Sequence, residues 1–268
     1  MMDKKETRDL NAASRAAWEA NAGFWDEKQG DLGNASHREQ IAPAALRLLN
    51  VQPGEIVLDA ACGNGVFARK LAALGAQVVG FDFSPAMIEN ARRYAAQSEH
   101  RGRMRFQVMD ATDEAQLLTL GAGRFDAVVS LMALMDMPEI APLCRAARRL
   151  LKPEGRFIFA VVHPCFNSAP GIVRVMEEED REGEIVEAHS LKMSRYLTGG
   201  AAKGLAIIGQ PAAQYYFHRP LHELLNTCFD AGFVLDQIDE PPIPQRERRR
   251  DSWASYNDIP PFFLARLR

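Results

Sequence analysis

Two acidic residues, Asp59 and Asp82, each end a short apolar run of the sequence. Asp59 is followed by the Gly-Asn-Gly segment at 63–65, and Asp82 follows the apolar run 78–81. This order predicts a strand, a tight turn, a helix and a second strand. Parallel strands bring their carboxyl ends to one edge of a sheet, where open α/β sheets bind nucleoside-containing ligands. We therefore expect both carboxylates beside such a ligand.

The acid before the glycine turn separates two candidate ligands. Residues 63–68 fit G-x-G-x-x-A, a pattern that also suits a nicotinamide dinucleotide. Asp59 would repel the pyrophosphate of a dinucleotide but suits the ammonium group of S-adenosylmethionine. Asp82 can accept both ribose hydroxyls of either ligand. The sequence thus predicts S-adenosylmethionine as cofactor, with S-adenosylhomocysteine as product, and an NAD(P)-dependent oxidoreductase is the alternative.

A third acid, Asp110, follows the run 105–109 and can accept a hydrogen bond from the adenine amino group. Residues after the other strands are expected to line the adenosine and the methionine portion. The predicted site consists of Asp59, Ala60, Ala61, Cys62, Gly63, Asn64, Gly65, Asp82, Phe83, Ser84, Met87, Met109, Asp110, Ala111, Ser130, Leu131 and Met132. Asp136 receives no catalytic role, because it begins a capping-box pattern, Asp136 to Glu139, before a predicted helix.

Apolar runs alternate with helix-like patterns along most of the chain. Strands are expected at 55–60, 77–81, 105–109, 125–131, 155–162, 233–238 and 261–267, with helices between most of them. This alternation predicts an α/β fold with a parallel sheet covered on both faces. Residues 1–54 form N-terminal helices, and residues 55–268 form the main domain. An insertion at about 164–217, with short strands around 185–197, is expected to cap the sheet edge. The basic run 246–250 is expected in a solvated loop.

Composition excludes several classes of protein. The 268 residues are 47% hydrophobic and 25% charged, with a formal net charge of −3, which gives no general attraction to nucleic acid or anionic membrane. The four cysteines include no C-x-x-C pair, so neither a zinc site nor a disulfide framework is indicated. No metal is expected. The polar N-terminus lacks a secretory signal pattern, and no apolar run reaches membrane-spanning length. We expect a cytoplasmic protein, either a monomer or a homodimer.

The chain resembles the class I S-adenosylmethionine-dependent methyltransferases. The resemblance rests on VLDAACGNG, VVGFDFS, VMDAT, FDAVVSLMALMDMPE and LKPEGRFIFAVVHPCF, with AGF and PPFFLARLR near the end. It implies a Rossmann-like sheet of seven strands, the last antiparallel, and an N-terminal lid to which Phe24 and Trp25 belong. The Asn-Pro-Pro-Tyr signature of adenine and glutamine N-methyltransferases is absent, as is the acid set of magnesium-dependent catechol-type enzymes. The resemblance therefore implies a methyltransferase for small molecules.

Several residues are candidates for contact with the methyl acceptor. His163 ends the fifth strand and can serve as a general base, with a structural histidine as the alternative. Tyr215, Tyr216 and His218 form an aromatic cluster that either contacts the acceptor or packs in the core. The leading expectation is transfer of a methyl group to O, N or C of a small organic acceptor. A nonenzymatic relative that binds the cofactor as a regulator remains a second alternative.

Overall fold

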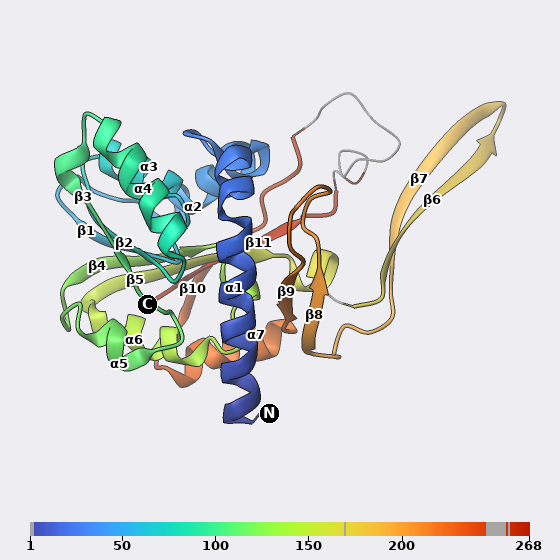
Figure 1. Cartoon of the computed structure of the whole chain (residues 1–268). Helices are drawn as coiled ribbons and strands as arrows, with labels where there is room; N and C mark the ends of the chain where they lie inside the picture. The colour runs from blue at the N-terminus through green and yellow to red at the C-terminus, as the bar shows by residue number, and fades with distance from the viewer. Residues whose placement is uncertain (1–2, 169, 245–255, 257) are drawn as a thin grey trace.

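A seven-stranded sheet forms the centre of the molecule (Figure 1). The computed structural model describes residues 3–168, 170–244, 256 and 258–268. The strand order is β10-β11-β5-β4-β1-β2-β3. The pairs along β5-β4-β1-β2-β3 are parallel, and β11 is antiparallel to both neighbours. The strands are β1 Ile56–Ala60, β2 Gln77–Asp82, β3 Met104–Val108, β4 Phe125–Leu131, β5 Leu151–Val162, β10 Leu235–Asp239 and β11 Phe262–Leu267. The predicted fold class is confirmed.

Helices cover both faces of the sheet, as Figure 1 shows. They are α1 Lys4–Gln29, α2 Ala42–Leu49, α3 Val66–Ala73, α4 Pro85–Gln97, α5 Glu114–Leu118, α6 Ala141–Leu150 and α7 Leu221–Asp230. Strand β1 contributes to the core on both faces of the sheet, because successive side chains of a strand point to opposite faces. Val57 packs in the cluster that includes residues of α2, α3 and α4, whereas Leu58 packs in the cluster of α5, α6 and α7.

Local signals set where α3 and α4 begin. The Ser84 Oγ accepts a hydrogen bond of 3.1 Å from the backbone nitrogen of Met87, and Pro85 occupies the first turn of α4. Gly65 precedes α3 with a φ of +74°, and a Cβ there would lie 3.1 Å from the Phe106 ring. Glycine at this position therefore permits the sharp turn from β1 into α3 and its close packing on β3.

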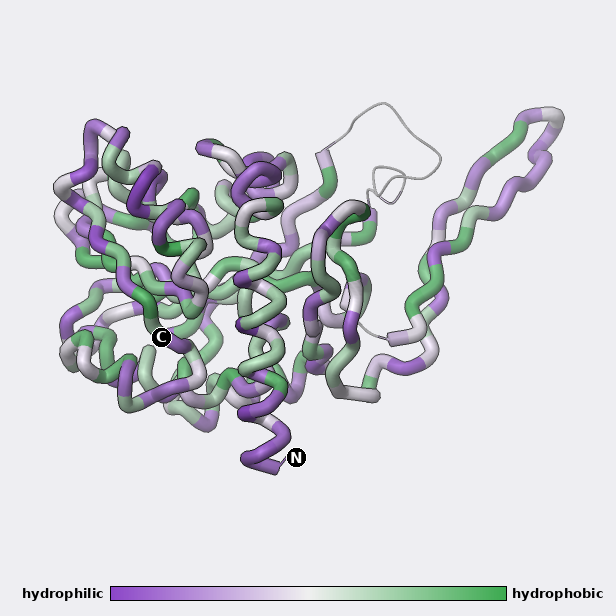
Figure 2. The backbone as a smooth tube through the Cα atoms, in the orientation of Figure 1, coloured by the Kyte–Doolittle hydropathy of each residue, from purple (hydrophilic) through white to green (hydrophobic). Residues whose placement is uncertain are grey.

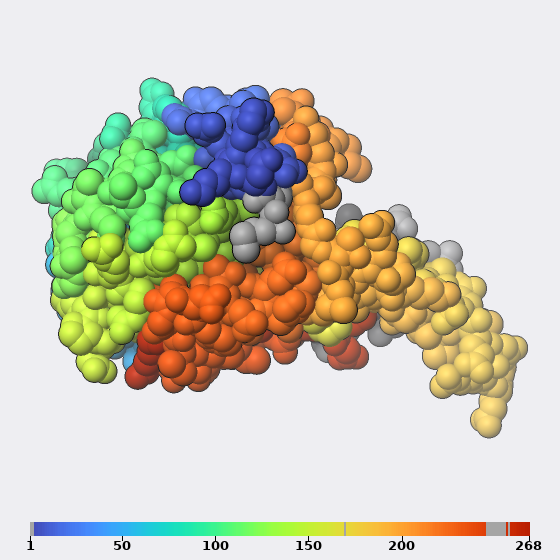
Figure 3. All heavy atoms as spheres, turned by 90° about the horizontal axis from the view of Figure 1, so that it is seen from below, coloured from blue at the N-terminus to red at the C-terminus, as the bar shows by residue number. Residues whose placement is uncertain are grey.

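The insertion contains two β-hairpins with different positions. They are formed by β6 Ile172–Arg181 with β7 Glu184–Met193, and by β8 Gly200–Gly204 with β9 Gln214–His218. The β8–β9 hairpin lies against the body, where β9 packs on α1, whereas the β6–β7 hairpin has a ring contact at His189, which packs edge-on against Tyr256 with centroids 5.1 Å apart. The β6–β7 hairpin projects away from the sheet edge (Figures 1 and 3), and Figure 2 shows mixed polar and apolar residues along it. Ala206, Ile207, Gln214 and Tyr216 of the insertion line the cavity at the sheet edge, and the role of residues 164–217 as a cap stays a prediction.

Two further expectations from the sequence concern the basic run and membrane-spanning segments. The basic run 246–250 lies outside the described residues. In the ranges that are described, no helix is long and apolar enough to cross a membrane.

Candidate functional site

A cavity of about 410 Å³ lies where the carboxyl ends of β1, β2 and β4 meet the N-terminal helices. Its volume falls within the range of small-molecule sites. Many residues of the predicted cofactor site line it. These are Trp25, Asp59, Ala61, Cys62, Gly63, Asn64, Asp82, Phe83, Met87, Met109, Asp110, Ala111, Leu131 and Met132.

Asp59, in β1, is buried in the wall of this cavity. Its Oδ2 atom has no hydrogen-bond partner, and only 2% of the residue is exposed. Burial, reinforced by the nearby charge of Asp82, raises the pKa of Asp59 to about 7. A cationic group in the cavity would favour the ionised form of this carboxyl. The position is suited to an ammonium or sulfonium ligand.

Asp82 connects the end of β2 to the glycine turn. Its Oδ2 atom accepts a hydrogen bond of 3.0 Å from the Gly63 backbone nitrogen, and its Oδ1 atom accepts one of 3.0 Å from Ser84. Burial raises the pKa of Asp82 to about 6, and these backbone hydrogen bonds oppose the rise. A Cβ on Gly63 would meet no protein atom within 4 Å, so the turn leaves open space beside the carboxylate.

Asp110 is held by residues from two segments. Its Oδ2 atom accepts a hydrogen bond of 2.7 Å from Asn11 Nδ2 in α1, and its Oδ1 atom accepts one of 2.8 Å from the Thr112 backbone nitrogen. Asn11 and Thr112 also line the cavity. The position of the Asp110 carboxylate in the cavity wall therefore depends on the position of α1.

Two residues in the cavity wall have an uncommon backbone conformation. Ala61 follows β1 with a φ of 56°, and Met132 follows β4 with a φ of 57°. Non-glycine residues rarely adopt this left-handed region, and they concentrate at functional sites when they do. Both lie at the strand ends where the sequence predicted the methionine portion.

The N-terminal segment forms the opposite wall. Trp18 and Trp25 line the cavity from α1, with ring centroids 5.7 Å apart. His37 packs edge-on against Phe67, and burial lowers its pKa to about 4, so the ring is neutral at pH 7. Figure 1 shows α1 standing across the sheet edge. The predicted lid position of Trp25 agrees with this geometry, whereas Phe24 does not line the cavity and packs edge-on against Trp25.

Several buried polar atoms of residues that line the cavity lack protein partners. They are Trp25 Nε1, His37 Nδ1, Asp59 Oδ2, Asp136 Oδ1 and the Tyr216 hydroxyl. An unpaired buried polar group costs about 1–3 kcal/mol. Their convergence on one cavity indicates a polar ligand that satisfies them.

Other predicted cofactor residues have structural positions outside the cavity. Ala60 is a buried strand residue, Ser130 is buried in β4, Gly65 serves helix packing and Ser84 caps α4. None of these four lines the cavity; in this structure they support the strands and helices that form the site, and their contact with a ligand stays a prediction.

The acceptor candidates divide in the same way, and only Tyr216 lines the cavity. His163 Nε2 lies 2.7 Å from Glu240 Oε1, and its Nδ1 atom accepts a hydrogen bond of 3.1 Å from the Cys165 backbone nitrogen. His218 contacts Ser168 Oγ and the Tyr196 carbonyl, at 2.9 Å and 2.7 Å. Because both rings have partners on both nitrogens away from the cavity, their predicted acceptor contact is corrected to a structural role.

Tyr215 also lies outside the cavity, where its ring stacks on Phe217 with centroids 6.3 Å apart. The packing interpretation of this tyrosine therefore fits the structure. Neighbouring residues of a strand point to opposite sides, which explains why Tyr216 reaches the cavity and Tyr215 does not.

Asp136 contradicts its predicted role as a helix cap. Helix α6 begins at Ala141 after Ile140, with no side-chain cap, whereas Asp136 lies in the short 3₁₀ turn η3, Leu134–Asp136. The residue is 7% exposed and lines the cavity. The capping-box pattern was misleading, because the chain makes a separate turn between β4 and α6. The sequence signal that could have identified Asp136 as a site residue was its position shortly after β4, which ends at the same edge of the sheet as β1 and β2.

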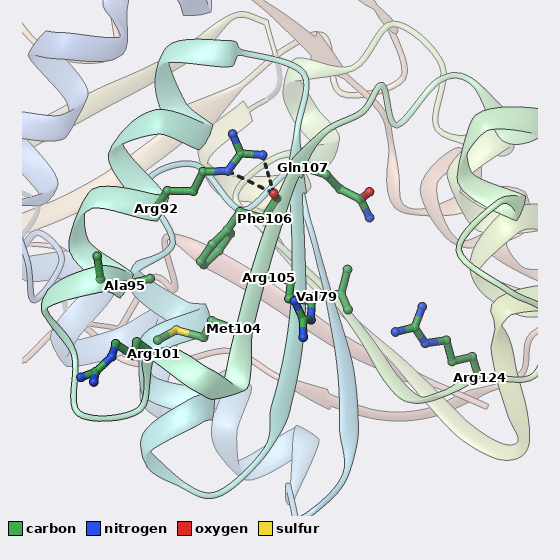
Figure 4. A pocket seen from close by; sticks show the side chains of 10 residues that line it. Val79, Arg92, Ala95, Arg101, Met104, Arg105, Phe106, Gln107 and Arg124 are labelled. Atoms are coloured by element: carbon green, nitrogen blue, oxygen red, sulfur yellow. Dashed lines mark hydrogen bonds between the residues drawn. The ribbon is translucent and has the colours of Figure 1, made fainter.

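A second hollow, of about 660 Å³, lies at the outer edge of β3. Figure 4 shows the side chains of Arg92, Arg101, Arg105 and Arg124 around it, and Arg92 donates hydrogen bonds to the Phe106 carbonyl. None of the predicted site residues lines this hollow. It is open and lies away from the strand ends, so the cavity at β1, β2 and β4 is the candidate site.

Metal chemistry has no apparent ligand set in the part of the chain that the structure describes. Within those residues, no group of three or more His, Cys, Asp or Glu side chains is placed to hold a metal ion.

Known proteins resemble this chain in sequence. A family model described as a methyltransferase domain matches residues 57–155. The chain is 31% identical over 160 residues to a ubiquinone biosynthesis O-methyltransferase of Alkalilimnicola ehrlichii, covering 58% of this chain and 62% of that protein. It is 30% identical over 131 residues to a protein of the same name from Coxiella burnetii, covering 48% and 53%. The matches thus span less than two thirds of these curated relatives.

Solved structures resemble the chain over a larger share. An S-adenosylmethionine-dependent methyltransferase from Mesorhizobium loti matches with a TM-score of 0.67 and 26% identity, covering 84% of this chain and 96% of that one. A putative enzyme of the same class from Listeria monocytogenes matches with a TM-score of 0.63 and 21% identity, covering 85% and 97%. The second likeness concerns the fold alone.

Proposed function

We propose that this chain, which belongs to the class I S-adenosylmethionine-dependent methyltransferases, is an enzyme that transfers a methyl group to a small organic acceptor. One observation carries the proposal beyond family membership. Asp59 and Asp82, the side-chain-free turn at Gly63 and several unpaired polar atoms converge on one cavity. The names of the curated relatives support oxygen as the accepting atom.

The donor set of the cavity fits S-adenosylmethionine. Asp59 would hold its ammonium group, Asp82 would accept the ribose hydroxyls, and the turn amides would contact the polar tail. Met109, Asp110 and Ala111 would surround the adenine, and Trp18 and Trp25 would exclude water from the site. The bound cofactor supplies an electrophilic methyl group on a cationic sulfur.

The residues of the chain contribute to methyl transfer mainly by positioning the acceptor and the cofactor. Methyl transfer proceeds in line, so the acceptor has to lie behind the methyl carbon with water excluded. The strand ends fix one side of the cavity, and α1 with the β8–β9 hairpin forms the other. This arrangement suits a dissolved small acceptor, and we propose a cytoplasmic location for the reaction.

The oxidoreductase alternative is opposed by the position of Asp59. A dinucleotide would bring its pyrophosphate to the turn that starts at Gly63, close to the buried carboxyls of Asp59 and Asp82. Among the described residues that line the cavity, no lysine or arginine offsets that repulsion.

Two measurements test the proposal. Calorimetry is expected to detect micromolar binding of S-adenosylmethionine and S-adenosylhomocysteine but not of NADH. A screen of small acceptors with methyl-labelled cofactor is expected to yield labelled product. Binding of NADH alone would establish the oxidoreductase alternative. Tight cofactor binding without transfer to any acceptor would leave the regulator alternative in its place.

A further inference from the structure

The loop that carries Asp136 is held in place by hydrogen bonds from Ser14 and Arg219. Ser14 Oγ in α1 donates one of 3.0 Å to the Asp136 carbonyl. The Arg219 guanidinium donates to the carbonyls of Leu134, at 3.0 Å, and Met137, at 2.6 Å. Arg219 therefore binds the backbone on both sides of Asp136 and holds the residue at the cavity wall.

The carboxyl of Asp136 is only half satisfied. Gln214 in β9 hydrogen-bonds to it, and the Gln214 Oε1 atom accepts a hydrogen bond of 2.8 Å from Gln210 Nε2. The Asp136 Oδ1 atom has no partner. A neutral amide chain thus supports one side of the carboxyl, and the other side is available to a ligand.

Tyr216 provides a second unpaired group in the same wall. Its hydroxyl is buried without a partner and lines the cavity. Burial and the nearby Asp136 raise the pKa of Tyr216 above its usual value, so the group remains a neutral hydroxyl that can donate a hydrogen bond. A proton donor and a proton acceptor are thereby presented near each other.

The charges of the cavity restrict what can enter this place. The carboxyls of Asp59, Asp82 and Asp110 line the cavity together with Asp136, and no lysine or arginine is among the described lining residues. His37 adds no positive charge at pH 7, because burial lowers its pKa to about 4. An acceptor that carries a carboxylate or phosphate would find no counter-charge here.

We propose that Asp136 and Tyr216 form the acceptor site, that they bind the hydroxyl group of an uncharged small molecule, and that Asp136 is its general base. This inference rests on the proposed methyltransferase function. The acceptor oxygen forms a bond to the methyl carbon, the carbon–sulfur bond breaks, and its electron pair stays on sulfur. The hydroxyl proton passes to Asp136 Oδ1 and reaches water when the products leave. The methylated ether, the neutral thioether and one proton balance the reaction.

The environment of Asp136 supports this role. Burial raises its pKa well above the usual value, the charge of Asp82 adds to the rise, and the hydrogen bond from Gln214 opposes it. Tyr216 is a neutral group whose pKa is raised further by the charge of Asp136, and the Arg219 guanidinium donates to carbonyls rather than to the carboxylate. A raised carboxyl pKa lies closer to that of a hydroxyl, which makes proton transfer easier.

The test compares the wild type with Asp136→Asn, Asp136→Glu and Tyr216→Phe. Glu139→Gln is the matched control, because it removes an exposed carboxyl from the same loop outside the cavity. The acceptors are a panel of uncharged phenols and alcohols, their carboxylate-bearing counterparts and their amine counterparts. Calorimetry with S-adenosylmethionine and thermal melting report whether each variant keeps its fold and cofactor site.

We expect product from uncharged hydroxyl acceptors only. Asp136→Asn should reduce kcat by about 100-fold or more, with partial recovery in Asp136→Glu. Cofactor affinity should stay within about twofold. The rise of kcat/KM with pH that reports ionisation of the base should disappear in Asp136→Asn and persist in Glu139→Gln. Tyr216→Phe should weaken binding of the uncharged acceptor to the complex with S-adenosylhomocysteine, a readout independent of turnover.

Three results would overturn the inference alone: transfer confined to amines, transfer to carboxylate-bearing acceptors as fast as to uncharged ones, or an unchanged pH profile in Asp136→Asn. An absence of transfer to every acceptor, with cofactor binding intact, would instead overturn the proposed function and the inference with it.

Discussion

The Asp82 Oδ2 atom and the Gly63 backbone nitrogen are joined by a hydrogen bond of 3.0 Å. This contact ties the end of β2 to the turn that follows β1, so one carboxylate both shapes the turn and faces the cavity. A ligand that binds Asp82 therefore also lies beside Gly63, where the absence of a side chain leaves space for it.

Asp82→Ala is expected to weaken S-adenosylmethionine binding by about 100-fold or more, because charge-assisted hydrogen bonds contribute about 1.5–3 kcal/mol each. Asp126→Ala is the matched control. Asp126 lies at the opposite edge of the sheet, where its carboxylate accepts a hydrogen bond of 2.8 Å from the Ile56 backbone nitrogen. Calorimetry should show a stability loss without an affinity loss for the control. Equal affinity in both variants would remove Asp82 from the ribose site.

The raised pKa of Asp59 predicts a proton release on cofactor binding. The pKa of this carboxyl is about 7 in the folded protein against 3.8 for a free aspartate side chain, so near pH 6 it is mostly protonated. A cationic ligand favours the ionised form, and binding at pH 6 should release up to about one proton, falling to none at pH 8. Calorimetry in buffers of different ionisation enthalpy measures this number. Asp59→Asn should remove most of this proton release. An unchanged number of released protons in the variant would show that a group other than Asp59 releases them.

The same shift has a consequence for stability without ligand. The folded protein holds the Asp59 proton more tightly than the unfolded chain, so this contribution is complete below pH 3.8 and is lost as the pH rises through about 7. The difference in unfolding free energy between wild type and Asp59→Asn should therefore shift against the wild type from pH 5 to pH 8. Denaturant titrations at the two pH values check the sign.

Gly33→Ala should damage the cavity from the lid side. Gly33 has a φ of +90°, and a Cβ there would lie 2.5 Å from His37 Nδ1, an atom of a residue that lines the cavity. Gly54→Ala is an exact control, since Gly54 has the same φ and a Cβ there would meet nothing within 4 Å. Both variants should lose about 1–2 kcal/mol of stability to backbone strain. Only Gly33→Ala should also lose cofactor affinity; the same affinity in both would show that His37 is not needed there.

His163→Gln should affect stability rather than turnover. Its ring is buried and bonded at both nitrogens, so removing it is expected to cost about 1–3 kcal/mol. Burial lowers the pKa of His163, so in the wild type the stability supplied by the neutral ring is lost as pH falls below about 6.5. Thermal melts at pH 5.5 and 7.5 should show that the variant lacks this pH dependence. A turnover number reduced by about 100-fold with an unchanged melting temperature would restore the catalytic interpretation.

Short motifs made the cofactor side of the site predictable from sequence. The acids at 59 and 82 and the turn between them belong to one strand–turn–helix–strand unit, so local spacing alone places them together. Asp136 was missed because a four-residue capping pattern matched locally, although the chain turns before α6 begins. Trp18 and Gln214 were missed because they reach the cavity through tertiary packing of distant segments, which leaves no signature in local spacing.

The cavity wall draws on α1, the ends of β1, β2 and β4, the β8–β9 hairpin and Phe262 of β11. No contiguous fragment therefore encloses it, and a growing polypeptide cannot sequester the nucleoside until β11 has been synthesised and inserted between β5 and β10. Affinity should consequently appear only after β11 has joined the sheet, and the rate of nucleoside binding during refolding would report completion of the sheet.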